Sequence, residues 1–123
     1  MERFHGSIEI AKANLENMIN RILKANPQFE IILMTMTPGD KYPAGYKSYR
    51  KDIGAHYEIY RSVAKERGFP LIDQYPNWKA LLANDRKLFD EYVPDIIHPT
   101  EKGCLKIITP VILHSLGIRE SKP

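Results

Sequence analysis

The stretch Phe29-Glu30-Ile31-Ile32-Leu33-Met34-Thr35-Met36 decides the fold. Five of the six residues from 31 to 36 are apolar, and they do not alternate with polar residues. A run this short is unsuited to a helix, and its lack of alternation is typical of a strand that is buried on both faces, as in a parallel sheet. We therefore predict a buried parallel strand over residues 29–36.

Amphipathic helices are predicted on both sides of this strand. The first begins near Ile8, where Ser7 is placed to cap it, and ends before Pro27, since proline disfavours helical geometry in the preceding residue. The second spans about residues 49–67 and ends at Gly68. Their apolar stripes are Ala11, Leu15, Met18 and Ile22 in the first helix and Ile53, Tyr57, Tyr60 and Ala64 in the second.

The remaining chain predicts one more strand and two more helices. The strand covers residues 69–73, a short helix covers 76–82, and residues 84–95 are irregular with at most one helical turn. A last helix follows Thr100, is kinked or split by Pro110, and ends at Gly117. Its apolar stripe is Leu105, Ile108, Ile112 and Leu116.

This alternation of helices and strands predicts an α/β fold with a parallel sheet. Two short strands are too few for an independent sheet, because three or more are usually needed. The chain is therefore predicted to be part of a larger sheet.

Size and composition restrict the class of protein. The 123 residues suit a single domain over 1–123, and a net charge of +3 with mixed signs does not favour a nucleic-acid partner. The single cysteine, Cys104, excludes an internal disulfide and a multi-cysteine zinc site. No apolar run is long enough to span a membrane, and no signal peptide is visible, so a cytoplasmic location is expected only if Met1 is the true start.

The sharpest chemical signal is Asp95 followed three residues later by His98, in a loop before a capped helix. A carboxylate at this distance can accept a hydrogen bond from Nδ1 of the imidazole, which leaves Nε2 free as a general base. The alternative is a loop aspartate and histidine without a chemical role. A metal site from these two residues and Asp73 has no supporting ligand spacing, and no cofactor is predicted.

The block Asp95-Ile96-Ile97-His98-Pro99-Thr100-Glu101-Lys102-Gly103 resembles the last block of the SGNH (GDSL-type) serine hydrolases, a D-x-x-H-P stretch followed by a helix with an early glycine. The order of the upstream elements is also similar to that family. The resemblance implies that Asp95 and His98 are the acid and base of a Ser-His-Asp triad. It further implies a three-layer α/β/α, flavodoxin-like fold, of which this chain supplies the last two strands and their helices.

The family's nucleophile and oxyanion blocks have no counterpart in this chain. Gly39-Asp40 is followed by Lys41 instead of serine, and no G-x-N-D block is present. Ser48 is the only serine predicted to be accessible near a strand end. Because much of the rate of acyl transfer comes from the oxyanion site, the chain alone is predicted to be inactive.

Two hypotheses follow. In the first, the chain is the C-terminal portion of an esterase that acts on a small acyl ester or a carbohydrate acyl ester, with the serine supplied by a missing N-terminal half or a partner chain. In the second, it is a truncated, non-catalytic module that uses its open sheet edge to self-associate or to bind a partner. Both predict a homo-oligomer.

Overall fold

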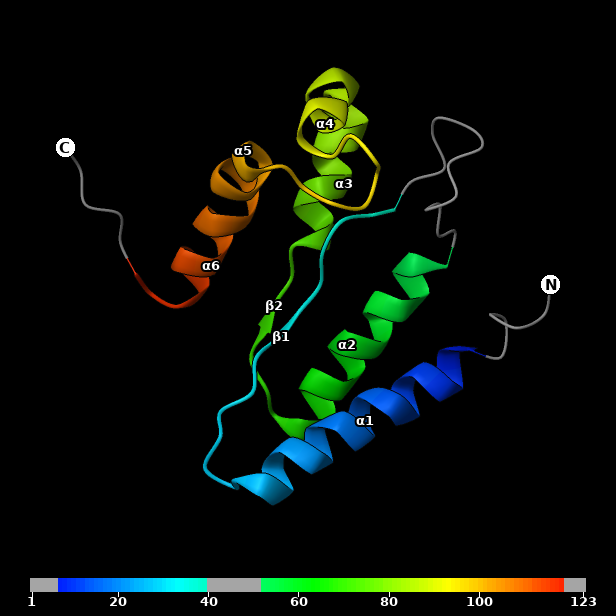
Figure 1. Ribbon diagram of the computed structural model, residues 1–123, viewed down its shortest axis with the longest axis vertical. Coiled ribbons are helices and arrows are strands. Elements are labelled where there is room, and N and C mark those ends of the chain that lie inside the picture. The colour runs from blue at the N-terminus through cyan, green and yellow to red at the C-terminus, as the bar shows by residue number, and fades with distance from the viewer. Residues whose placement is uncertain (1–6, 40–51, 119–123) are drawn as a thin grey trace. The chain divides into compact units, whose positions relative to one another are not determined.

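The computed structural model describes residues 7–39 and 52–118, which fall into two compact units. Of these residues, 7–33 and 54–71 form the first unit, and 34–39, 52–53 and 72–118 form the second. The order of elements alternates between helix and strand as predicted (Figure 1). That residues 1–123 make one domain stays a prediction.

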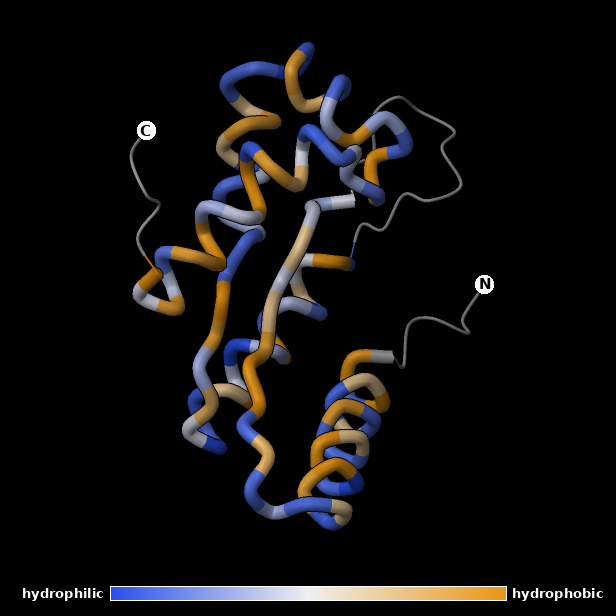
Figure 2. Tube along the Cα trace, turned by 60° about the vertical axis from the view of Figure 1, so that its left-hand side comes forward, coloured by the Kyte–Doolittle hydropathy of each residue, from blue (hydrophilic) through white to orange (hydrophobic). Residues whose placement is uncertain are grey.

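The first unit is built on two helices, α1 (Ser7–Ala25) and α2 (Ile53–Arg67). The predicted stripe of α1 is partly wrong: Leu15 is buried, but the helix turns Ile19 inward and leaves Met18 more than half exposed. Figure 2 shows apolar residues interspersed with polar ones along this helix. The buried residues of this unit are Leu15, Ile19, Leu33, Ile59, Val63 and Ala64.

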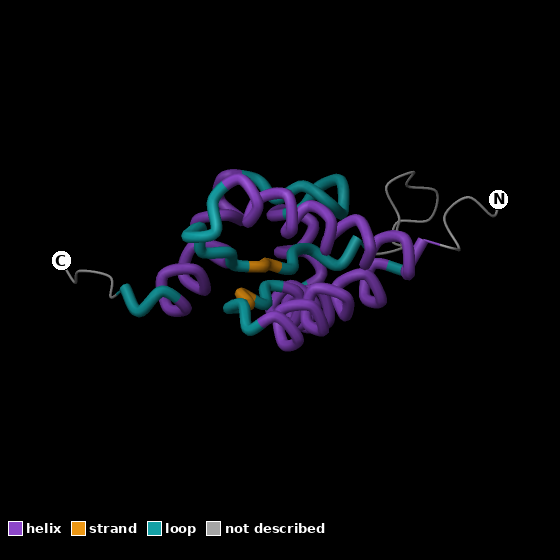
Figure 3. Tube along the Cα trace, turned by 90° about the horizontal axis from the view of Figure 1, so that it is seen from below, coloured by secondary structure: helices purple, strands orange, loops and turns teal. Residues whose placement is uncertain are grey.

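Two short parallel strands make up the sheet (Figure 3). They are β1 (Leu33–Met34) and β2 (Leu71–Ile72), and each contributes its first residue to the first unit and its second to the second unit. The Leu33 amide donates to the Pro70 carbonyl at 3.0 Å, and the Thr35 amide donates to the Ile72 carbonyl at 3.1 Å.

The predicted strand lengths, residues 29–36 and 69–73, are wrong. Within the described residues β1 has a strand partner on one side only, so one edge of the apolar run forms no ladder that would extend it. Ile32, predicted to be buried, is 44% exposed.

The second unit contains the remaining helices. They are α3 (Tyr75–Asn84), α4 (Arg86–Tyr92), α5 (Glu101–Gly103), a π-helical turn (Cys104–Ile108) and α6 (Thr109–Ser115). The helix α4 lies where we predicted irregular chain. The missed signal is Asp85, whose side chain accepts a hydrogen bond from the Leu88 amide at 3.0 Å and so caps the helix.

Aromatic side chains fill the core of this unit. Trp78 and Phe89 are fully buried and meet edge to face, with ring centroids 6.1 Å apart. Trp78 therefore has a packing role. Gly103 allows a close approach, since a Cβ there would lie 3.0 Å from the carbonyl oxygen of Tyr92. The buried residues that pack together in this aromatic cluster are Trp78, Phe89, Tyr92, Val93 and Ile108.

The last helical segment runs without a break from Glu101 to Ser115, and a π-helical turn lies just before Pro110. The Thr109 amide donates to the Cys104 carbonyl, five residues back, instead of four. In a regular α-helix the ring of Pro110 would clash with the carbonyl of Lys106. One wider turn just before the proline opens the backbone there, as π-bulges do in other helices.

Candidate active site

The loop between α4 and α5 is closed by hydrogen bonds of its own backbone. The Ile96 amide donates to the Val93 carbonyl at 3.0 Å, and the Thr100 amide donates to the Tyr92 carbonyl at 2.8 Å. The Thr100 hydroxyl then accepts from the Gly103 amide at 3.1 Å and caps α5, as predicted from the sequence. The loop that carries Asp95 and His98 is thus held at both ends.

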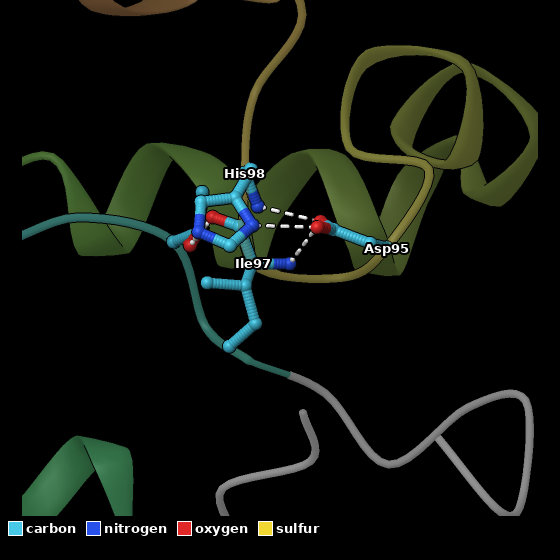
Figure 4. Close-up of polar contacts among 4 residues, drawn as sticks. Asp95, Ile97 and His98 are labelled. Atoms are coloured by element: carbon cyan, nitrogen blue, oxygen red, sulfur yellow. Dashed lines mark hydrogen bonds and ion pairs between the residues drawn. The ribbon is translucent and has the colours of Figure 1, made fainter. Parts of the chain in front are cut away.

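The two oxygens of Asp95 have different tasks (Figure 4). Oδ1 accepts the backbone amides of Ile97, at 3.0 Å, and His98, at 2.6 Å. Oδ2 lies 2.5 Å from Nδ1 of the His98 ring. One oxygen therefore folds the turn, and the other contacts the imidazole.

These contacts lower the pKa of Asp95 to about 2 from an ordinary 3.8. The hydrogen bond from the His98 amide is the largest cause, and the hydrogen bond from the His98 side chain is the next. An ionised carboxylate only accepts hydrogen bonds, so Nδ1 carries the proton in this contact. In a neutral imidazole this leaves the lone pair of Nε2 free to take up a proton.

The pair is open to solvent: the His98 side chain is 80% exposed and that of Asp95 is 48% exposed. A reactant can therefore reach Nε2. The structure brings together the two residues that the sequence singled out, in the geometry that the sequence predicted. Their catalytic role stays a prediction.

A threonine after β1 also contacts this loop. Thr37 is buried, and its hydroxyl donates to the carbonyl of Ile97 at 2.7 Å. This bond joins the segment that leaves the sheet to the residue beside His98. The sequence did not identify Thr37 as a residue that contacts this loop.

A second polar cluster lies where β1 and β2 end. Thr35 is fully buried, donates to Asp73 Oδ1 at 2.5 Å, and accepts from the Tyr75 amide at 3.0 Å. Gln74 is also fully buried, and its Nε2 donates to the carbonyl of Ile108 at 3.1 Å. Sequence reasoning placed Thr35 in a buried strand without giving it a role, and it missed Gln74 because nothing in a single sequence distinguishes a buried glutamine from an exposed one.

No serine is identified as a nucleophile among the residues that the structure describes. Ser48, the candidate from the sequence, lies outside them. Within residues 7–39 and 52–118, no serine hydroxyl is hydrogen bonded to His98, and no three histidine, cysteine or acidic side chains are grouped to hold a metal ion. The same described ranges contain no helix with the length and apolar character to cross a bilayer.

Comparison with known proteins gives a family and a fold. The model of the GDSL-like lipase/acylhydrolase family matches residues 3–104. The chain is also similar to the esterase domain of the ZfL2-1 ORF1 protein from the zebrafish ZfL2-1 retrotransposon, with 21% identity and a TM-score of 0.66. That match covers 90% of this chain and 60% of the esterase-domain chain. No curated protein matches.

These findings confirm the predicted fold class. The chain is an α/β protein with a small parallel sheet, and it corresponds to part of an SGNH hydrolase fold. The match spans less than two thirds of the zebrafish domain, in line with the prediction of an incomplete sheet.

Proposed function

Because the chain belongs to the GDSL-like lipase/acylhydrolase family, we propose that Asp95 and His98 are the acid and base of an ester hydrolase. The observation that carries this proposal is the 2.5 Å contact between Asp95 Oδ2 and His98 Nδ1. Acylhydrolase membership supports hydrolysis at the level of the family. The serine nucleophile and the oxyanion donors would come from outside the described residues, in a preceding segment or a partner chain.

The chemistry that this geometry serves has two halves. Nε2 of His98 removes the proton from the serine hydroxyl as its oxygen attacks the ester carbonyl, and then gives that proton to the departing alcohol. In the second half, water attacks the carbonyl of the acyl-enzyme. His98 takes a proton from this water and returns it to the serine oxygen as the carboxylic acid departs. Asp95 stays ionised throughout, keeps the proton on Nδ1 before each transfer, and stabilises the imidazolium that forms.

The proposed substrate is a small acyl ester, with an acetylated carbohydrate as one form. His98 is exposed, so the described residues do not enclose its imidazole. Binding contacts for the acyl and alcohol groups would then lie on the same segment or partner chain that supplies the serine. The chain alone is proposed to be inactive for the same reason, since oxyanion donors usually account for a large part of the rate.

The test is reconstitution. The chain would be produced together with the polypeptide encoded immediately upstream of Met1, and hydrolysis of p-nitrophenyl acetate would be measured. We expect activity that falls roughly 10²- to 10⁴-fold in His98→Ala, the range for loss of a general base. The matched control is His114→Ala, which removes an exposed histidine on α6 and should leave the rate unchanged. Activity indifferent to His98 would refute the proposal.

A second candidate function is a non-catalytic module that self-associates. The observation that favours it is the set of large apolar side chains left exposed on the first unit, Ile10, Met18, Ile22, Phe29 and Ile32. Reconstitution separates the two candidates, because a purely structural module gains no hydrolysis when the upstream segment is supplied.

A further inference from the structure

Ile96, between Asp95 and His98, has an unusual backbone conformation. Its φ angle is +64°, and among the described residues it is the only non-glycine with a positive φ. A β-branched residue is rare in this left-handed region, because its Cβ crowds the backbone there. Such a conformation persists only where the surroundings hold it in place.

Two features hold Ile96 in this conformation. Its side chain is 1% exposed, so leaving the left-handed turn would bring a buried apolar group into water. Its amide donates to the Val93 carbonyl, and the carbonyl of the next residue, Ile97, accepts from the Thr37 hydroxyl. The backbone is therefore anchored on each side of the strained residue.

The turn at Ile96 sets the direction of the groups that meet Asp95. Only Ile96 and Ile97 separate the carboxylate from His98. With φ at +64°, the amides of Ile97 and His98 both point to Oδ1, and the ring of His98 reaches Oδ2. A change of φ at Ile96 to the ordinary negative region would turn both amides away together.

We propose that Ile96 is a positioning residue, whose buried side chain locks the left-handed turn and so holds the imidazole of His98 on the carboxylate of Asp95. Its importance for hydrolysis rests on the proposed function; the lock itself does not. Glycine would adopt this φ without crowding, but it would also adopt negative φ values readily. Isoleucine gives a turn that is strained and rigid where glycine would give one that is relaxed and mobile.

The experiment is NMR on the 123-residue chain, which requires no nucleophile. The carboxyl ¹³C of Asp95 reports its pKa, and the ring ¹⁵N shifts of His98 at alkaline pH report which nitrogen is protonated. The unmodified chain should show Asp95 titrating at about 2, with the proton on Nδ1 of His98. In Ile96→Gly we expect the pKa of Asp95 to rise toward 3.8, with a mixture of both tautomers.

Two further variants separate positioning from general stability. Ile96→Val keeps a β-branched, buried side chain and should restore the behaviour of the unmodified chain. Ile108→Ala removes a buried side chain of the same unit and should lower stability without moving the pKa of Asp95. If Ile96→Gly does not fold, Ile96→Ala carries the test with Ile96→Val as its control: the pKa of Asp95 must rise in the alanine variant and stay unchanged in the valine variant.

An Asp95 pKa that stays at about 2 in folded Ile96→Gly or Ile96→Ala would overturn the inference. The proposed function fails in a different way. If Ile96 holds the pair but the family chemistry is absent, Asp95 shifts in these variants while the reconstituted protein hydrolyses no ester. If the function is right and the lock is wrong, hydrolysis depends on His98 but the NMR signals of the glycine variant do not move.

Discussion

The two units of the chain differ in the kind of side chain that they bury. The second encloses aromatic side chains completely, with Trp78 and Phe89 both at 0% exposure, and carries the Asp95–His98 pair on a loop closed by backbone hydrogen bonds. The first unit buries one side of α1 but leaves Met18 on that helix, and Phe29 beyond its end, more than half exposed. The site thus belongs to the unit whose aromatic core is fully buried, although both units display exposed apolar side chains, with Leu105, Leu116 and Ile118 at least half exposed on the second.

The largest expected effect concerns the loop of the second unit. In Asp95→Asn, the amide oxygen still accepts both backbone amides, so the turn is kept, but the amide nitrogen now faces Nδ1 of His98 and donates to it. The proton moves to Nε2, where it blocks the base. We expect the reconstituted esterase rate to fall by roughly 10²- to 10⁴-fold.

The control for this substitution is Asp85→Asn, at the cap of α4. Asparagine caps helices about as well as aspartate, so neither rate nor stability should change. An Asp95→Asn variant as active as the unmodified protein would show that the carboxylate serves only to fold the turn.

The next prediction concerns how much the buried aromatic core of the second unit contributes to stability. Trp78→Ala removes its largest buried side chain and should lower the free energy of unfolding by about 3–5 kcal/mol, measured with urea. Phe29→Ala truncates an aromatic residue of the first unit that is 53% exposed, and should cost no more than about 0.5 kcal/mol. Equal losses from the two substitutions would contradict the difference between the units.

A third prediction tests how closely the second unit is packed beside the site. In Gly103→Ala the new Cβ would lie 3.0 Å from the Tyr92 carbonyl oxygen and 3.1 Å from its Cβ. Both neighbours are held, since that carbonyl accepts the Thr100 amide. We expect the free energy of unfolding to fall by about 1–3 kcal/mol, the usual cost of overpacking a core. Lys106→Ala, at an exposed position in the following turn, should unfold at the same urea concentration as the unmodified chain.

The difference between the units also explains what the sequence could predict. Asp95 and His98 could be found because their contact is local: three residues and a helix cap determine it. The stripe of α1 could not be resolved, because apolar residues lie on more than one side of the helix, and the choice of Ile19 over Met18 depends on which neighbour it packs against. Strand β1 was predicted too long because pairing partners, and not apolar character alone, set the length of a strand.

Two features of the site were hidden for another reason. The positive φ of Ile96 contradicts the preference of its residue type, so propensity argues against it. Likewise the burial of Gln74 depends on a carbonyl supplied by Ile108, 34 residues away, which no local pattern reveals. Both appear only once the packing of the second unit is known.

A smaller effect is expected with pH. Because the pKa of Asp95 is lowered in the folded chain, its ionised form stabilises the fold above pH 3.8, and this contribution is lost as pH falls from 3.8 through about 2. The side chain is about half exposed, so solvent weakens the contribution. The urea midpoint should therefore fall slightly less in Asp95→Asn than in the unmodified chain over this range. Parallel curves would show that the carboxylate adds nothing to the stability of the loop.

The smallest effect lies on α1, where the outer and inner sides can be compared at adjacent positions. Met18→Gln replaces an exposed side chain and should change the free energy of unfolding by less than about 0.5 kcal/mol, while Ile19→Gln places an amide at a position that is 1% exposed and should cost several times more. A cost at Met18 comparable to that at Ile19, and growing with protein concentration, would mean that the outer side of α1 is covered by another polypeptide in solution. The first unit would then bury part of its exposed apolar surface against that neighbour.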